Sequence, residues 1–126
     1  MDINIKHRKI IDIFQRRLLR KNILNIKWPV VINNEAVYNQ TKAKQWSNVI
    51  RKRRMRWFGH VMRLPEQTPA RKAMQYADEK YIRPRGRPPT TWLSMMKKQL
   101  IDDHKLTWPE ACDIAKDRIM WNKYSK

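Results

Sequence analysis

The sequence predicts an all-α fold, a small helical bundle of about five to six helices joined in part by a proline- and arginine-rich loop. Apolar residues recur at helical spacing in several segments, and few segments alternate as strands do. Only 2 of the 126 residues are glycine. The chain contains 6 Trp and 41% hydrophobic residues, which argues against a wholly disordered tail because such tails are poor in aromatic residues.

Residues 1–64 are predicted to form a basic helical subdomain with helices at about 3–22, 34–40 and 44–64. In the first segment the apolar residues at helical spacing predict a buried stripe of Ile10, Phe14 and Leu18, widened by Ile11, Ile13 and Leu19. Trp28 precedes a proline, which ends the helical region because the residue before proline avoids the α conformation. Asn33 or Asn34 is suited to cap the second helix.

The segment 44–64 is predicted to be apolar on two sides and basic on a third. The first apolar face comprises Trp46, Val49, Ile50, Trp57, His60, Val61 and Leu64. The second comprises Met55, Phe58 and Met62, and Lys52, Arg56 and Arg63 share the remaining sector. A helix of this kind is usually sandwiched between others, so we expect it to be the spine of the fold. Base stacking by Trp57 or Phe58 is the alternative to their packing in the core.

Residues 65–126 are predicted to form a second helical subdomain, with a loop at 78–89. Thr68 and Pro69 open a short helix that extends to Ala77, since proline suits the first helical position. Thr90 or Thr91 caps the next helix, which carries an apolar stripe and breaks near His104. Thr107 and Glu110 have the spacing of a capping box at the start of a last helix that continues through Trp121. The aromatic residues expected in the core are Trp57, Phe58, Trp92 and Trp121.

The charge of the chain predicts a polyanionic partner. The 29 Lys and Arg against 11 Asp and Glu give a net charge of +18, and nucleic acid is the commonest partner of so basic a domain. An anionic membrane is the weaker alternative, because no two-faced surface helix is apparent. We expect contacts to RNA, DNA or a hybrid. The phosphate-contacting residues predicted in the densest basic stretch are Arg51, Lys52, Arg53, Arg54, Arg56 and Arg63.

A second arginine site is predicted in the loop. The segment Pro84 to Pro88 reads PRGRP, follows Arg83 and matches the core of an AT-hook. Its prolines hold the backbone extended, Gly86 allows a close approach to a groove, and a narrow A·T-rich minor groove attracts arginine. Arg83, Arg85 and Arg87 are therefore predicted to contact a groove or a backbone. A stiff linker with solvated arginines is the alternative.

The sequence predicts no active site, metal or cofactor. His7, His60 and His104 are far apart and lack the spacing of metal ligands with the single Cys112. His60 is expected to be a core histidine, and the adjacent Asp102 and Asp103 diverge too much on a helix to share a metal. Cys112 lacks an evident base that would make it a nucleophile.

The cellular location is predicted from what the sequence lacks. A single cysteine excludes a disulfide framework and favours a reducing compartment. The amino-terminal segment has no secretory apolar region, and no apolar stretch reaches the ~18 residues that span a bilayer. We therefore expect a nuclear or cytoplasmic protein that is not secreted.

The chain resembles the C-terminal region of the endonuclease–reverse transcriptase polyproteins of non-LTR retrotransposons. Residues 53–65, RRMRWFGHVMRLP, are similar to the family's RRLRWFGHVLRMP. Shorter matches occur in the same order along the chain: FQRRLLR at 14–20, IKW at 26–28, NEAV at 34–37, PARKA at 69–73, RGRP at 85–88, TW at 91–92, and AKDR at 115–118 with Trp121. The family pattern has more basic residues after RGRP, where this chain has Pro89 and Thr90.

This resemblance implies a segment that lies after the polymerase palm, in the thumb and the basic tail that help to hold template RNA or target DNA. The palm aspartates and the endonuclease have no counterpart here, so the resemblance implies no catalytic activity for the chain. The upstream reverse transcriptase domains are an expected partner if the chain is a fragment. The alternatives are an autonomous AT-hook protein that binds the DNA minor groove and a retrotransposon relic without function.

Overall fold

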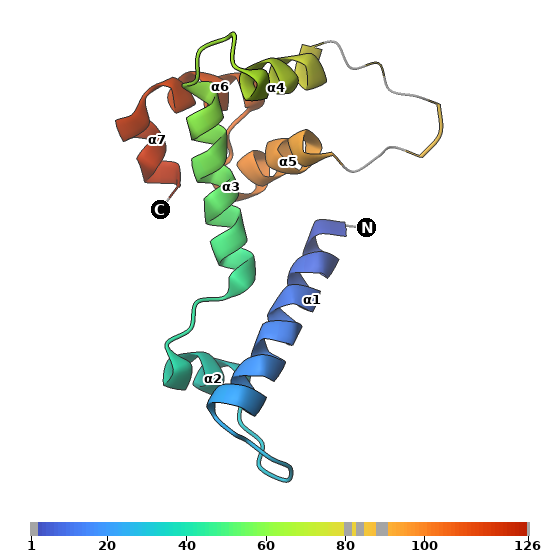
Figure 1. Ribbon diagram of the computed structural model, residues 1–126, viewed down its shortest axis with the longest axis vertical. Helices are drawn as coiled ribbons and strands as arrows, with labels where there is room; N and C mark the ends of the chain where they lie inside the picture. The colour runs from blue at the N-terminus through green and yellow to red at the C-terminus, as the bar shows by residue number, and fades with distance from the viewer. Residues whose placement is uncertain (1–2, 80–81, 83–84, 88–90, 126) are drawn as a thin grey trace. The chain divides into compact units, whose positions relative to one another are not determined.

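A computed structural model describes residues 3–79, 82, 85–87 and 91–125. These residues form seven α-helices and contain no strand, which confirms the predicted all-α class (Figure 1). The helices are α1 (Ile3–Leu18), α2 (Asn34–Thr41), α3 (Trp46–Met62), α4 (Pro69–Glu79), α5 (Trp92–His104), α6 (Trp108–Lys116) and α7 (Arg118–Tyr124). A π-helical turn, η1 (Leu19–Ile23), follows α1.

The chain divides into two compact units, residues 1–51 and residues 52–126. We call them unit 1 and unit 2. Their boundary lies within α3, whereas the sequence predicted subdomains that meet between Leu64 and Pro65. The amino-terminal turns of α3 thus belong with α1 and α2, and its remaining turns belong with α4 to α7.

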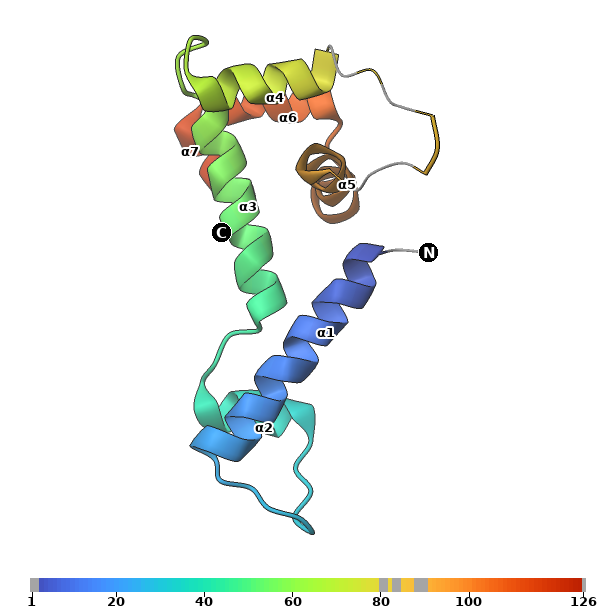
Figure 2. The same ribbon diagram turned by 45° about the vertical axis from the view of Figure 1, so that its right-hand side comes forward.

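In unit 1 the predicted helix 3–22 changes character after Leu18. The backbone continues as η1, in which the N–H of Leu24 donates to the carbonyl of Leu19 at 3.0 Å. The Arg20 guanidinium donates to Oδ1 of Asn34 at 2.7 Å and joins this turn to the start of α2. Asn33 caps α2 by accepting from the N–H of Ala36 at 2.7 Å, as one of the two predicted caps. α2 lies beside the carboxyl end of α1 in both views (Figures 1 and 2).

The centre of unit 1 is polar. Gln15 is 2% exposed, and its amide donates to the carbonyl of Lys44 at 2.8 Å and accepts from the N–H of Trp46 at 2.9 Å. One turn earlier, Asp12 accepts from the N–H of Ser47 at 3.1 Å and from its hydroxyl at 2.7 Å. Two of the free N–H groups at the start of α3, those of Trp46 and Ser47, are therefore satisfied by side chains from α1. A carboxylate at this end also suits the helix dipole.

The stripe predicted to bury α1 was therefore wrong at Ile10, Ile13 and Phe14 and is confirmed at Leu19. Ile10 and Phe14 are 53% and 55% exposed, while Gln15 and Leu19 face the interior of unit 1. Helical periodicity identified the helix. Its buried side, however, is the one whose polar side chains form hydrogen bonds with the backbone at the start of α3. Spacing of apolar residues alone does not carry that information.

Unit 2 has an apolar core to which all of its helices contribute. The buried residues of this core are Met55, Phe58, Val61, Met62, Met74, Leu93, Met96, Leu100, Ala111, Ala115 and Trp121. α4 runs alongside α6 in both views (Figures 1 and 2), and Nε1 of Trp108 on α6 donates to Asp78 on α4 at 2.9 Å. Asp78 also pairs with Lys97 on α5, so one carboxylate joins three helices.

Only one of the two predicted apolar faces of α3 is buried. Met55, Phe58 and Met62 lie in the core as predicted, together with Val61 from the other face. Trp46, Ile50 and Trp57 are 41%, 37% and 46% exposed, and His60 is exposed as well. The prediction of a sandwiched helix with a core histidine was therefore wrong, because most of the first predicted face is exposed.

Helix ends in unit 2 follow the predicted caps. Thr91 and Ser94 form a reciprocal capping box at the start of α5, and Thr107 and Glu110 form one at the start of α6. The predicted last helix is divided in two, however. Asp117 adopts an extended conformation after α6, and its carboxylate accepts from the N–H groups of Ile119 and Met120 at 2.7 and 3.2 Å. An aspartate that caps a new helix explains why the chain turns there.

Candidate nucleic-acid interface

The basic run on α3 is divided between two sides of the helix. Successive residues turn by about 100°, which places Arg51 and Arg54 on the side that carries Phe58. Both are half-buried. Lys52, Arg53 and Arg56 lie on the opposite side and are exposed, and Arg63 follows two turns later on the same side. The exposed part of the run is therefore a ridge of Lys52, Arg53 and Arg56.

The ridge continues into a hollow between α3 and α7. Its volume is about 540 Å³, and it is lined by Arg56, His60, Arg63, Arg118, Trp121, Asn122 and Ser125. α3 contributes Arg56 and His60, which are four residues apart, and Arg63 follows the end of this helix. α7 contributes Arg118, Trp121 and Asn122, and Ser125 follows its end, so each helix presents one face to the hollow. Of the described residues that line it, none is acidic. The hollow therefore combines three guanidinium groups with an imidazole and lacks a compensating carboxylate.

Gly59 and Trp121 set the spacing of the two helices that form this hollow. The indole of Trp121 is 1% exposed, and its Nε1 donates to the carbonyl of Met55 at 2.8 Å. A Cβ atom at Gly59 would overlap the indole ring, so only glycine permits this close approach. Phe58 supports the same ring at a centroid distance of 5.2 Å. The position of α7 is thus fixed by packing within the core.

One arginine of the hollow is held in place by the backbone of α6. Nη1 of Arg63 donates to the carbonyl of Ala115 at 2.8 Å. Ala115 lies near the end of α6, where carbonyl groups are without helical partners. Arg63 consequently has a fixed position beside the hollow, and Arg56 and Arg118 are exposed at its edge.

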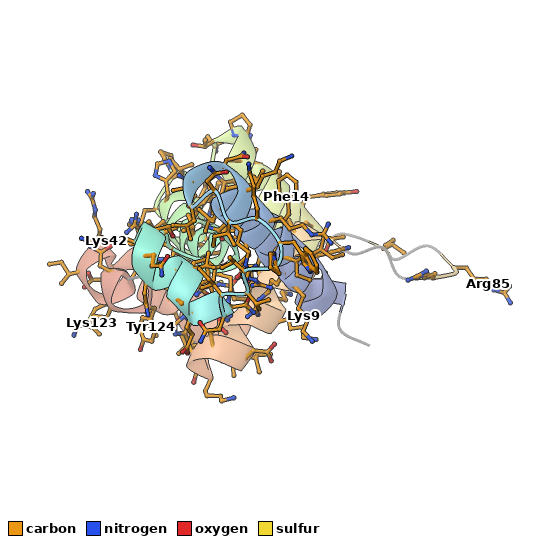
Figure 3. All side chains as sticks on the ribbon, turned by 90° about the horizontal axis from the view of Figure 1, so that it is seen from below. Lys9, Phe14, Lys42, Arg85, Lys123 and Tyr124 are labelled. Atoms are coloured by element: carbon orange, nitrogen blue, oxygen red, sulfur yellow. The ribbon has the colours of Figure 1, made fainter. Side chains whose placement is uncertain are left out.

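The loop between α4 and α5 carries the second predicted arginine site. Arg85 and Arg87 are exposed, and Figure 3 shows Arg85 extending away from the helices. Gly86 has a φ of +121°, a conformation that favours glycine, and no atom lies within 4 Å of the position that a Cβ atom would take. Glycine is therefore needed here for the backbone conformation and not for a close contact within the protein. Arg83 lies outside the described residues.

The aromatic residues divide between the core and its rim. Phe58 and Trp121 are buried as predicted, but Trp57 pairs edge-on with the partly buried Trp92 at a centroid distance of 4.6 Å. The prediction that Trp57 belongs to the core was wrong. Trp57 lies four residues after Arg53 and therefore borders the ridge on that side of α3.

Sequence reasoning missed Arg118, His60 and Asn122 as members of one site. Arg118 and Asn122 are four residues apart and share the face of α7 that carries Trp121. The signal was the helical spacing of polar residues around a buried tryptophan. The sequence predicted one continuous helix over this segment. That prediction did not indicate that Arg118 and Asn122 would lie beside α3.

A second, smaller hollow lies on the α4 and α6 side of unit 2 and has a mixed character. Its volume is about 180 Å³, and Glu66, Asp78, Glu79 and Cys112 contribute to it together with Arg71 and Lys116. Burial raises the pKa of the Cys112 thiol, and the nearby Asp78 carboxylate adds to that effect. The thiol is therefore held in its less nucleophilic, protonated form. Across the described residues, no three His, Cys, Asp or Glu side chains come together as metal ligands would.

Comparison with known proteins identified no relative of this chain. No family model, curated protein or solved structure matches the chain. In the part of the chain that the structure describes, no helix has the length and apolar character needed to cross a membrane. The assignment of function therefore depends on the arrangement of the residues themselves.

Proposed function

We propose that this chain is a nucleic-acid-binding module without catalytic activity, which contacts the phosphates of template RNA or target DNA and is related to the C-terminal region of a non-LTR retrotransposon reverse transcriptase. The observation that carries the proposal is the acid-free basic surface of α3 and α7. Lys52, Arg53 and Arg56 form its exposed ridge, and the hollow continues it. A net charge of +18 supplies the long-range attraction to a polyanion.

Four acidic residues of unit 2 support this proposal by their positions. Asp78 is bonded to Lys97 and Trp108, and Asp113 pairs with Lys116 at 2.8 Å. Glu110 and Asp117 serve as helix caps. These carboxylates stabilise α4 to α7 rather than neutralise the ridge. Excess positive charge on one surface is the usual electrostatic footprint of phosphate binding.

The first test is the salt dependence of binding to labelled duplex DNA, single-stranded RNA and an RNA–DNA hybrid of one sequence. If roughly six phosphates are neutralised on duplex DNA, the slope of log K against log salt concentration should be about −5. The preferred nucleic acid is the one with the highest affinity at about 0.15 M salt. An affinity that does not change with salt concentration would overturn the proposal.

The second test reverses charge on the ridge. The triple variant Lys52→Glu, Arg53→Glu, Arg56→Glu should reduce the affinity by more than a hundredfold, because it removes about three phosphate contacts and adds repulsion. Its matched control is Lys27→Glu, Lys72→Glu, Lys123→Glu, which makes the same change in net charge at exposed positions elsewhere. A control that loses as much affinity as the ridge variant would show that net charge, and not the ridge, governs binding.

The loop supports a second candidate, an AT-hook-type contact with the DNA minor groove. Arg85 and Arg87 are exposed, and Gly86 has the positive φ and open surroundings that allow the backbone to lie against a groove. This candidate predicts a preference for A·T-rich duplex that disappears in Arg85→Ala, Arg87→Ala. If the ridge is the main site, that double variant retains most of its affinity and the ridge variant does not.

A further inference from the structure

We propose that the hollow between α3 and α7 binds the terminal phosphate of a nucleic-acid strand. This inference rests on the proposed function and assigns a specific ligand group to one part of the basic surface. It adds His60, Arg118 and Asn122 to the residues that the sequence indicated. The ridge, by comparison, is suited to phosphates along the strand.

The concave form of the site favours a strand end over an internal phosphate. Phosphates within a duplex face outward along a continuous backbone, and exposed side chains on a ridge reach them. A hollow of about 540 Å³ can admit a projecting group, and its volume lies in the range of small-molecule sites, roughly 300–1,000 Å³. A terminal phosphate with part of its nucleotide fits such a volume.

The charge of the hollow also favours a terminal phosphate. An internal phosphodiester carries one negative charge, whereas a phosphate monoester carries about −1.5 to −2 at pH 7. Arg56, Arg63 and Arg118 provide three guanidinium groups, and guanidinium groups bind phosphate oxygens in pairs of parallel hydrogen bonds. His60 supplies a further nitrogen donor. The site therefore matches a dianion better than a monoanion.

The arrangement of the hollow is set before a ligand arrives. Arg63 is held by the carbonyl of Ala115, and Trp121 is fixed by its hydrogen bond to Met55. Asp117, the acid adjacent to Arg118 in the chain, is directed to the N–H groups of Ile119 and Met120. Its carboxylate is thereby used for the cap of α7. These contacts fix Arg63 and the indole wall of the hollow, and they engage the carboxylate of Asp117 at the start of α7.

The experiment compares one oligonucleotide of fixed sequence with a 5′-phosphate, a 3′-phosphate or two hydroxyl ends. Fluorescence anisotropy should show about tenfold tighter binding of at least one phosphorylated form, the size expected of one or two added charge-assisted hydrogen bonds. Arg118→Gln should abolish this preference, which is measured as the ratio of the affinities of the phosphorylated and hydroxyl forms for the same variant. Lys72→Gln, an equal loss of charge at an exposed position on α4, should retain the preference.

The outcomes separate this inference from the proposed function. Equal binding of all three oligonucleotides, or a preference that survives in Arg118→Gln, would overturn the terminal-phosphate site while the ridge remains a nucleic-acid site. If no oligonucleotide binds, the proposed function fails, and inorganic phosphate becomes the probe. NMR resonances of the His60 ring and the Trp121 indole N–H should then shift on phosphate addition in the original chain but not in Arg118→Gln. Unshifted resonances would overturn the site as well.

Discussion

Unit 1 and unit 2 are both helical and both basic, but different forces hold them together. Among the residues described in unit 1, Leu19 and Val37 are the buried apolar side chains, and the interior is organised by Gln15, Asp12 and Ser47. Unit 2 buries eleven apolar residues in one core. Burial of apolar surface is the main favourable term in folding, whereas hydrogen bonds contribute less but fix direction. The apolar core therefore gives unit 2 most of its stability. In unit 1 the hydrogen bonds mainly fix the alignment of α1 with the start of α3.

This difference has a functional consequence for the basic surface. The hollow and the ridge belong to unit 2, where Trp121 and Phe58 fix the packing of α7 on α3 and the carbonyl of Ala115 holds Arg63. The basic residues of unit 1 lie on a scaffold with little buried apolar surface, which is expected to open at lower free energy. A pre-organised phosphate site is therefore expected in unit 2 rather than in unit 1.

The largest expected effect comes from removing the tryptophan at the centre of unit 2. Trp121→Ala should lower the free energy of unfolding by about 3–5 kcal/mol, because it leaves a large cavity and removes the hydrogen bond from the indole to the carbonyl of Met55. Guanidinium denaturation followed by far-UV circular dichroism measures the change. Trp28→Ala is the control, since Trp28 is 92% exposed and its removal should alter stability by no more than about 0.5 kcal/mol. Equal effects of the two substitutions would contradict a core centred on Trp121.

The next effect is specific to unit 1. Gln15→Leu should destabilise the contact between α1 and α3 by about 1–3 kcal/mol, because the N–H of Trp46 and the carbonyl of Lys44 both lose a partner. Hydrogen exchange measured by NMR should show faster exchange at Trp46 and Ser47 and unchanged exchange in the core of unit 2. Gln40→Leu, at an exposed position of α2, serves as the control. Unchanged exchange at Trp46 in Gln15→Leu would show that the polar centre is dispensable.

A smaller effect is expected at the contact between α3 and α7. Alanine is favoured over glycine within a helix by about 0.5–1 kcal/mol, but forcing a methyl group against a packed ring costs about 1–3 kcal/mol. Gly59→Ala should therefore destabilise unit 2 by about 1–2 kcal/mol in a denaturation experiment. In a Trp121→Leu background, where the indole is gone, the same substitution should become neutral or stabilising. A Gly59→Ala chain that is more stable than the original would mean that α7 does not approach α3 so closely.

The fold was more predictable from the sequence than the buried faces and the site. Local signals specified the caps at Asn33, Thr91 and Thr107, since capping depends on residues within one turn of each other. The buried side of α1 depends on Gln15 meeting Trp46, 31 positions away, and no local pattern encodes that partner. The hollow likewise needs Arg118 to meet Arg56, which requires the turn at Asp117 and the close packing at Gly59. The basic residues of α3 could be recognised in the sequence as a run of charge. Which of them are exposed and which are half-buried depends on the side of α3 that packs in the core.

The smallest expected effect concerns the capping box of α6 and depends on pH. The hydroxyl and the backbone N–H of Thr107 donate to the Glu110 carboxylate at 2.7 and 2.9 Å, and these bonds lower the pKa of Glu110. The ionised carboxylate therefore stabilises the fold above the pKa of the unfolded chain, about 4.3, and this contribution is lost as the pH falls through the lowered pKa of the folded state.

Glu110→Gln retains an acceptor for the cap but cannot titrate in this way. Thermal melts from about pH 6 to about pH 3 should show the original chain more stable than Glu110→Gln at the upper end, with a difference that shrinks as the pH falls. A Thr107→Val background lacks the hydroxyl donor that most lowers the pKa of Glu110. In that background the stability difference between the chain with Glu110 and the Glu110→Gln chain should change less with pH. A difference that grows on acidification would have the opposite sign to a lowered pKa and would exclude the capping carboxylate as its source. Unit 1 has no part in this cap, so its hydrogen exchange at Trp46 should be the same in both chains at each pH.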